Sequence, residues 1–154
     1  SKLINVELIN AAVSSKIGHA VMEIPRFDTG GESLYDAYIA ASVPPDSSLR
    51  TFRVETLTLD SRFAAYPHRI TFIKCDIEGH ELECVRGAKT LIARDHPVWL
   101  IEITGDPDSA GSQAAQTFQF MREAGYIDAI YETGQLRKRR PGEKHLNYFF
   151  VTTL

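Results

Sequence analysis

The 154-residue sequence lacks several features that would place it in a restricted class of proteins. It has no apolar run approaching the ~20 residues that a membrane-spanning helix needs, and its first residues, SKLINVEL, lack the pattern of a secretory signal peptide. The net charge is −3, without the broad basic excess that a nucleic-acid partner would require. Cysteine is scarce: we expect Cys75 and Cys84 to be buried free thiols in a reduced, cytoplasmic setting.

What the sequence does contain is typical of a folded domain. Hydrophobic residues make up 44% and charged residues 24%, which is a globular rather than a disordered composition. The length suits a single domain, residues 1–154, with one sizeable core.

The most informative stretch is residues 69–93, RITFIKCDIEGHELECVRGAKTLIA. Its short apolar run, residues 70–75, predicts a strand buried on both faces of a sheet. An acidic turn around Gly79 follows, and apolar residues then recur at helical spacing from Leu82 to Ile92. In open α/β sheets, ligands bind in the crevice beyond the carboxyl ends of the strands, where this turn is expected to lie.

Strands and helices alternate around that stretch. The centre reads as β-α-β-α-β, which implies parallel strands with right-handed crossovers. The last two strands have only a charge-rich loop, residues 132–145, between them, and this predicts an antiparallel pair at one sheet edge. Asp60 is a candidate cap for a short helix ending near Ala65. The other predicted strands are residues 6–10, 19–25, 51–59, 98–103, 126–131 and 146–152, and a helix is predicted at residues 113–124.

The segment FIKCDIEGHELECVRGA resembles the hallmark of FkbM-type methyltransferases, in which a strand leads to Asp-x-Glu-Gly-x-Glu and then to a helix that runs into a Gly-Ala pair. The matching residues here are Asp76, Glu78, Gly79, Glu81, Gly87 and Ala88. Three further segments, VETLTLD, PVWLIEI and NVELINAAVSSKIGHA, resemble flanking parts of the same family, so the resemblance spans nearly the whole chain.

The resemblance implies an α/β, Rossmann-like class I methyltransferase sheet whose last strand is inserted antiparallel. We therefore expect a mostly parallel sheet with an antiparallel C-terminal edge hairpin. It also implies transfer of a methyl group from S-adenosylmethionine to a hydroxyl group of a sugar or polyketide-like secondary metabolite.

One departure from the family concerns the cofactor. Family members carry a glycine turn after their first strand, followed by an acidic residue that holds the ribose, and no such segment precedes Val6. The pair Gly30-Gly31 comes too late in the chain to replace that turn. We expect the chain to correspond to the C-terminal two-thirds of such a domain, lacking the N-terminal cofactor-binding strands. A missing N-terminal segment or a homo-oligomer would then cover the open sheet edge.

Four residues are candidates for catalysis. Asp76 follows the central strand, where the resemblance puts the methionine end of the cofactor and the acceptor, so its carboxylate would bind there and would position the acceptor hydroxyl or accept its proton. Glu78, His80 and Glu102 would orient the acceptor or act as a base. The alternatives are a helix cap for Asp76, a solvated turn for Glu78 and His80, and an ion pair for Glu102.

The cofactor-binding candidates are Asn10, Ala11, Ala12 and Val13, which we expect to form a turn after the first strand. The resemblance implies that this turn packs beside the adenine ring, where small residues would leave room for it. The alternative is an ordinary junction between a strand and a loop.

Other interpretations stay open at this point. We predict no metal site, because the acidic turn has no second ligand group at metal spacing elsewhere in the sequence. The second interpretation, after the methyltransferase, is a non-catalytic α/β binding or assembly module that lacks the cofactor half. The third is a metal-dependent hydrolase that uses the acidic turn. The basic run at residues 137–140 is either a solvated loop tip or a site that captures an anionic acceptor. Trp99 is expected in the core.

Overall fold

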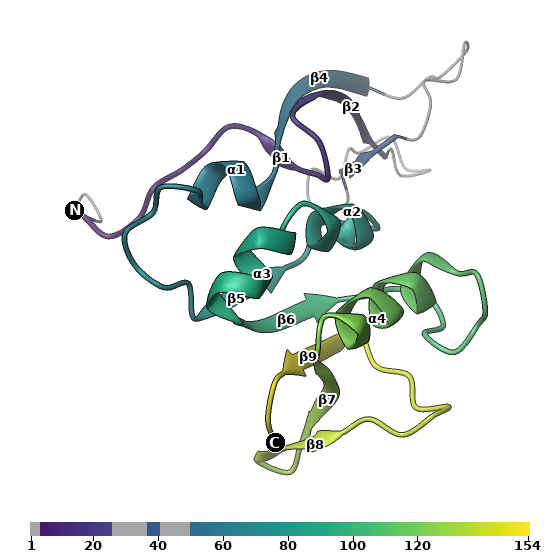
Figure 1. Cartoon of the computed structure of the whole chain (residues 1–154). Helices are drawn as coiled ribbons and strands as arrows, with labels where there is room; N and C mark the ends of the chain where they lie inside the picture. Colours follow the sequence, from purple (N-terminus) through teal and green to yellow (C-terminus); the bar gives the residue numbers. More distant parts are fainter. Residues whose placement is uncertain (1–3, 26–36, 41–49) are drawn as a thin grey trace.

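The computed structural model describes residues 4–25, 37–40 and 50–154 (Figure 1). Gly30 and Gly31 lie outside these ranges. The described elements are β1 (Ala12–Val13), β2 (Gly18–Ile24), β3 (Tyr38–Ile39), β4 (Arg50–Leu57), α1 (Leu59–Phe63), β5 (Phe72–Cys75), α2 (Glu81–Arg86), α3 (Lys89–Asp95), β6 (Val98–Glu102), α4 (Gln113–Glu123), β7 (Ile127–Glu132), β8 (Gln135–Lys138) and β9 (Asn147–Val151).

The chain has a mixed α/β architecture with two sheets. The first has the strand order β1-β4-β2-β3 and the second the order β5-β6-β9-β7-β8. Among the described strands, only the β1–β4 and β5–β6 pairings are parallel, and the other five are antiparallel. The expectation of a mostly parallel sheet is therefore wrong. The antiparallel pairings of β2 with β4 and of β9 with β6 and β7 account for most of the difference.

The last strand lies inside its sheet. β9 is antiparallel both to β6, with Trp99 opposite Phe150, and to β7, with Ala129 opposite Phe149. This confirms the antiparallel insertion that the resemblance implied, but the prediction that the last two strands form the sheet edge is wrong. Beyond β7, the edge is formed by β8, in a segment that we predicted to be loop.

The β7–β8 hairpin has a local cause. Glu132 pairs with Gln135, so the loop between the strands consists of Thr133 and Gly134 alone. Both have positive φ, 51° and 87°, as a type I′ hairpin turn requires. Glycine at the second position favours this turn. The dipeptide Thr-Gly therefore indicated a hairpin, but the many charged residues around it led us to predict a loop.

The helix predicted after the acidic turn is two helices. The apolar face from Leu82 to Ile92 is buried as expected, but α2 ends before Gly87 and α3 begins at Lys89. Asp60 stabilises the new helix start, since its carboxylate accepts hydrogen bonds from the backbone N–H groups of Thr90 and Leu91, at 3.0 and 2.8 Å. The predicted capping role of Asp60 thus belongs mainly to α3, while Thr58 caps α1.

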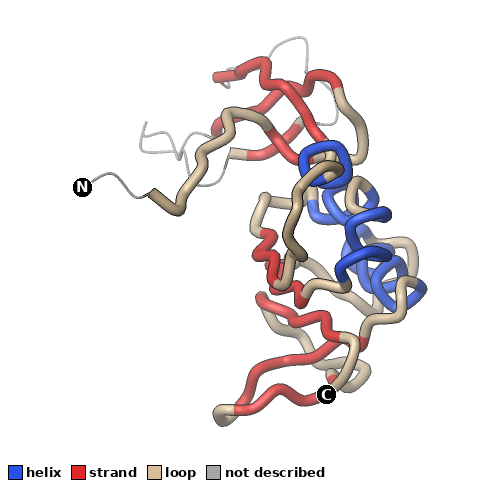
Figure 2. The backbone as a smooth tube through the Cα atoms, turned by 60° about the vertical axis from the view of Figure 1, so that its left-hand side comes forward, coloured by secondary structure: helices blue, strands red, loops and turns tan. Residues whose placement is uncertain are grey.

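The core lies between the five-stranded sheet and the helices that cover one side of it (Figure 2). Phe118 of α4 packs edge-on against Tyr148 and Phe150 of β9, with ring centroids 4.9 and 5.1 Å apart. Trp99 is fully buried, and Cys75 and Cys84 are buried free thiols, as predicted. In the part of the chain that the structure describes, every helix is too short or too polar to span a membrane.

Two predicted strands differ from the structure. Strand β5 forms an edge among the described strands, pairing only with β6, and Phe72 is 52% exposed, so the expectation of a strand buried on both faces is wrong. The segment at residues 6–10 is extended but unpaired, and Leu8 is 92% exposed. Strand pairing begins only at Ala12, which lies opposite Thr56 of β4.

Candidate active site

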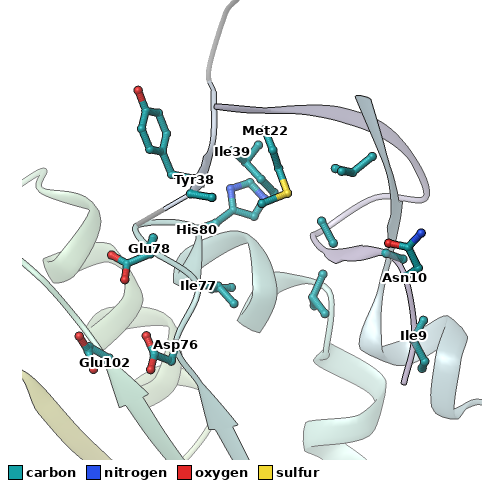
Figure 3. Close-up of a pocket in the computed structure, with 15 residues that line it drawn as sticks. Ile9, Asn10, Met22, Tyr38, Ile39, Asp76, Ile77, Glu78, His80 and Glu102 are labelled. Atoms are coloured by element: carbon teal, nitrogen blue, oxygen red, sulfur yellow. The ribbon is translucent and has the colours of Figure 1, made fainter. Parts of the chain in front are cut away.

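A pocket of about 590 Å³ lies where the first sheet meets the carboxyl ends of β5 and β6 (Figure 3). Its volume falls within the ~300–1,000 Å³ of typical small-molecule sites. Every catalytic and cofactor-binding residue predicted from the sequence lines it. The full lining is Ile9, Asn10, Ala11, Ala12, Val13, Met22, Ala37, Tyr38, Ile39, Val54, Asp76, Ile77, Glu78, His80 and Glu102.

Two carboxylates stand together on the acidic side of the pocket. Asp76 and Glu102 follow directly after Cys75 and Ile101, which are opposite each other in the parallel β5–β6 pair. Lys74 donates a 2.5 Å hydrogen bond to Asp76, and this bond is the main reason why the pKa of the lysine is raised. Lys74 thus fixes the position of one carboxylate oxygen of Asp76 at the end of β5.

The acidic turn has an unusual backbone. Glu78 and Gly79 both have positive φ, 49° and 88°, and the Gly79 N–H donates a 2.9 Å hydrogen bond to the buried carboxylate of Glu81. The turn exposes Glu78 to the pocket (Figure 3). The N-cap of α2 is His80, and Asp76 does not cap this helix, so that alternative is wrong.

His80 has its ring in the pocket and its Nε2 atom 3.0 Å from Ser14 Oγ (Figure 3). Burial lowers the pKa of this histidine, against the opposing effect of the nearby Glu83 and Glu81 carboxylates. Burial thus favours the neutral form of the ring, and one of its nitrogens is occupied by the serine.

The opposite wall comes from the first sheet. Ala12 and Val13 form β1 itself, while Asn10 and Ala11 precede it, so the prediction that these four residues make a turn after a strand is wrong. The cause is the register of β1 on β4, which begins with Ala12 opposite Thr56. The short side chains of the alanines nevertheless leave open space beside the carboxylates.

Seven lining residues were not singled out from the sequence. They are largely apolar and add a hydrophobic wall to the pocket; Tyr38 also donates a 2.7 Å hydrogen bond to the buried carboxylate of Glu23. The alternation of HAVMEI in β2 was a weak signal for Met22. No local pattern identified the others, which are Ile9, Ala37, Tyr38, Ile39, Val54 and Ile77.

The other candidate chemistries receive no support from the geometry. Within the described ranges, no group of three or more His, Cys, Asp or Glu residues could hold a metal ion. In the basic run, Arg137 pairs with Glu132 and Glu143, and Arg139 is buried against Asp108. These two arginines hold the C-terminal loop together, and neither lines the pocket.

The lining fits part of S-adenosylmethionine. The small apolar residues Ala11, Ala12 and Val13 leave space for a flat ring, and Asp76 and Glu102 supply acceptors for hydroxyl and amino groups. The lining residues that the structure describes include no glycine, so the glycine turn that the family resemblance implies has no counterpart among them.

A mixed α/β fold with a ligand-sized pocket at the carboxyl ends of two parallel strands, next to an Asp-x-Glu-Gly turn, defines a candidate transferase site. The family model of the methyltransferase FkbM domain matches residues 2–127, and the chain belongs to this family. The match covers every predicted site residue and ends at the start of β7. Comparisons with curated proteins and with solved structures gave no match.

Proposed function

We propose that this domain is an S-adenosylmethionine-dependent O-methyltransferase that methylates a hydroxyl group of a sugar or secondary metabolite. The observation that carries the proposal is the pocket itself. Residues from two distant parts of the sequence, 10–13 and 76–80, line one cavity together with Glu102. Membership of the FkbM methyltransferase family supports the same reaction class.

In this proposal the two walls of the pocket have different roles. Asn10, Ala11, Ala12 and Val13 hold the adenine side of the cofactor, and Asp76 holds its methionine end. When bound, S-adenosylmethionine supplies an electrophilic methyl group on a sulfonium. Asp76 and Glu102 would orient the acceptor hydroxyl in line with that methyl group. One carboxylate would accept the hydroxyl proton as the O–CH3 bond forms and the S–CH3 bond breaks, with S-adenosylhomocysteine as the leaving group.

The strand order supports a Rossmann-like methyltransferase architecture in one domain. The core β5-β6-β9-β7 has its last strand antiparallel between two strands that run in the same direction. We further propose that the exposed edge of β5 pairs with another strand, from a longer form of the chain or from a second copy, because open edges with exposed apolar residues such as Phe72 favour pairing.

The buried free thiols support a reduced, cytoplasmic setting.

A non-catalytic binding module is the second candidate, favoured by the lack of a glycine in the described pocket lining. Calorimetric titration with S-adenosylhomocysteine separates the two. We expect micromolar binding with a stoichiometry of about one, and methylated product when hydroxylated sugars and metabolites are screened with labelled cofactor. Absence of binding, both to this chain and to any longer natural form, would contradict the methyltransferase proposal and leave the binding module.

A further inference from the structure

The two walls of the pocket belong to different sheets. Residues 12–13 form β1 of the first sheet, while Asp76 and Glu102 follow or end strands of the second. No strand pairing joins the two sheets within the described residues. The width of the pocket therefore depends on side-chain and loop contacts between them.

One cluster of such contacts lies directly after β1. Ser14 Oγ lies 3.0 Å from His80 Nε2, and the Ser15 hydroxyl donates a hydrogen bond to the Glu83 carboxylate. The Ser15 hydroxyl is also the main cause of the lowered pKa of Glu83. Both bonds connect the end of the first wall to the first turn of α2, next to the acidic turn.

His80 is the member of this cluster that lines the candidate active site. His80 also lines a second cavity of about 390 Å³, together with Ser14, Ser15 and Glu83 among others. His80 and Ile39 line both cavities. The bond between His80 and Ser14 thus joins a residue that lines both cavities to the segment that follows the first sheet's β1.

We propose that His80 is a positioning residue, whose bond to Ser14 holds the wall at residues 10–13 at the correct distance from the carboxylates and closes the pocket. This role rests on the proposed cofactor site. In this role His80 helps to bind the adenine side of the cofactor and does not take the proton from the acceptor hydroxyl. A hydrogen bond of this kind contributes about 0.5–1.5 kcal/mol net, equivalent to a factor of about 2 to 13 in affinity.

A double-mutant cycle tests the proposal. We expect Ser14→Ala and His80→Leu each to weaken S-adenosylhomocysteine binding by about 3- to 10-fold, and the double variant to be no weaker than the worse single variant. His80→Gln places an amide near the position of Nε2, and we expect it to restore most of the affinity and turnover. His68→Ala, at an exposed histidine outside the pocket, is the matched control and should leave affinity unchanged.

Several results would overturn the inference. Additive losses from Ser14→Ala and His80→Leu would show that the two residues are not coupled. Wild-type affinity with abolished turnover in both His80→Leu and His80→Gln would assign His80 to proton transfer instead. If the wild-type protein does not bind S-adenosylhomocysteine, the proposed function fails, and the same cycle measured by thermal unfolding still tests the link: additive shifts in Tm would contradict it.

Discussion

The backbone carbonyl oxygen of Ser14 lies against the α-carbon of Gly87, so closely that a Cβ at this glycine would be 2.2 Å from it. Gly87 is the residue at which α2 ends, and its own carbonyl accepts a 2.9 Å hydrogen bond from the backbone N–H of Asp60. The glycine of the Gly-Ala pair therefore serves the contact between the two sheets. Its φ of −81° shows that close approach, and not a left-handed backbone, is the reason for glycine here.

Replacing Gly87 with alanine should consequently destabilise the fold. The clash is with backbone, which cannot rotate away, so we expect a loss of about 1–3 kcal/mol in the free energy of unfolding, measured by urea denaturation. Gly18→Ala is the matched control, because the nearest atom to its Cβ would be 3.8 Å away. Equal stability of the two variants would show that the chain at Ser14 moves freely away from α2.

Asp76→Asn should separate chemistry from folding. The side chain is partly exposed and bonds to Lys74, so its amide analogue keeps the shape and leaves the core intact. If Asp76 steers or accepts the acceptor proton, turnover with a methyl acceptor should fall about 10²-fold or more. The thermal unfolding midpoint should stay near that of the wild type. Unchanged turnover would remove Asp76 from the mechanism.

Arg139 should be a structural residue rather than an anion-binding one. Its side chain is 1% exposed, forms an ion pair with Asp108, and packs with its guanidinium carbon 5.3 Å from the centre of the Phe118 ring. Arg139→Met keeps much of the volume but leaves Asp108, whose side chain is 35% exposed, without this partner, and we expect a loss of about 1–3 kcal/mol by urea denaturation. Lys138→Met, at the exposed neighbouring position, should change stability by only about 0.5 kcal/mol. Similar small effects of both substitutions would contradict the buried role.

Stability should fall in acid because of Asp95. This carboxylate is 5% exposed and accepts hydrogen bonds from Arg94 and from the Ile70 N–H; the Arg94 bond contributes most to lowering its pKa from 3.8 to about 2. A pKa that is lower in the folded state gives stability that is present above about pH 4 and is lost as the pH falls toward 2.

The measurement is the free energy of unfolding between pH 5 and 2 for the wild type and for Asp95→Asn. The variant should be less stable at pH 5, and its decline with acid should be shallower. Part of the decline should persist, because Arg137 also lowers the pKa of Glu143 to about 2. Parallel curves for the two proteins would show that Asp95 does not contribute.

The residues that the sequence singled out line one pocket, and for the acidic turn the sequence signal was local. Asp76, Glu78 and His80 follow an apolar strand and precede a helix, and that order alone puts them at a strand's carboxyl end. The residues at 10–13 were chosen through the family resemblance, although the secondary structure expected for them was wrong. The apolar residues Met22 and Ile39 were missed, because an apolar residue in a strand is indistinguishable by pattern from a core residue.

By itself, the sequence determined the burial of the Leu82–Ile92 face, the buried thiols and the membership of a methyltransferase family, since each depends on residue type and short-range spacing. Tertiary structure alone decided that β9 lies between β6 and β7, that α2 and α3 are separate, and that the wall after Ile9 faces Asp76. The physical reason is the same in each case. Strand neighbours and close backbone approaches, such as Ser14 on Gly87, are contacts between residues far apart in the chain, and local periodicity carries no information about which distant segment will fill a given space.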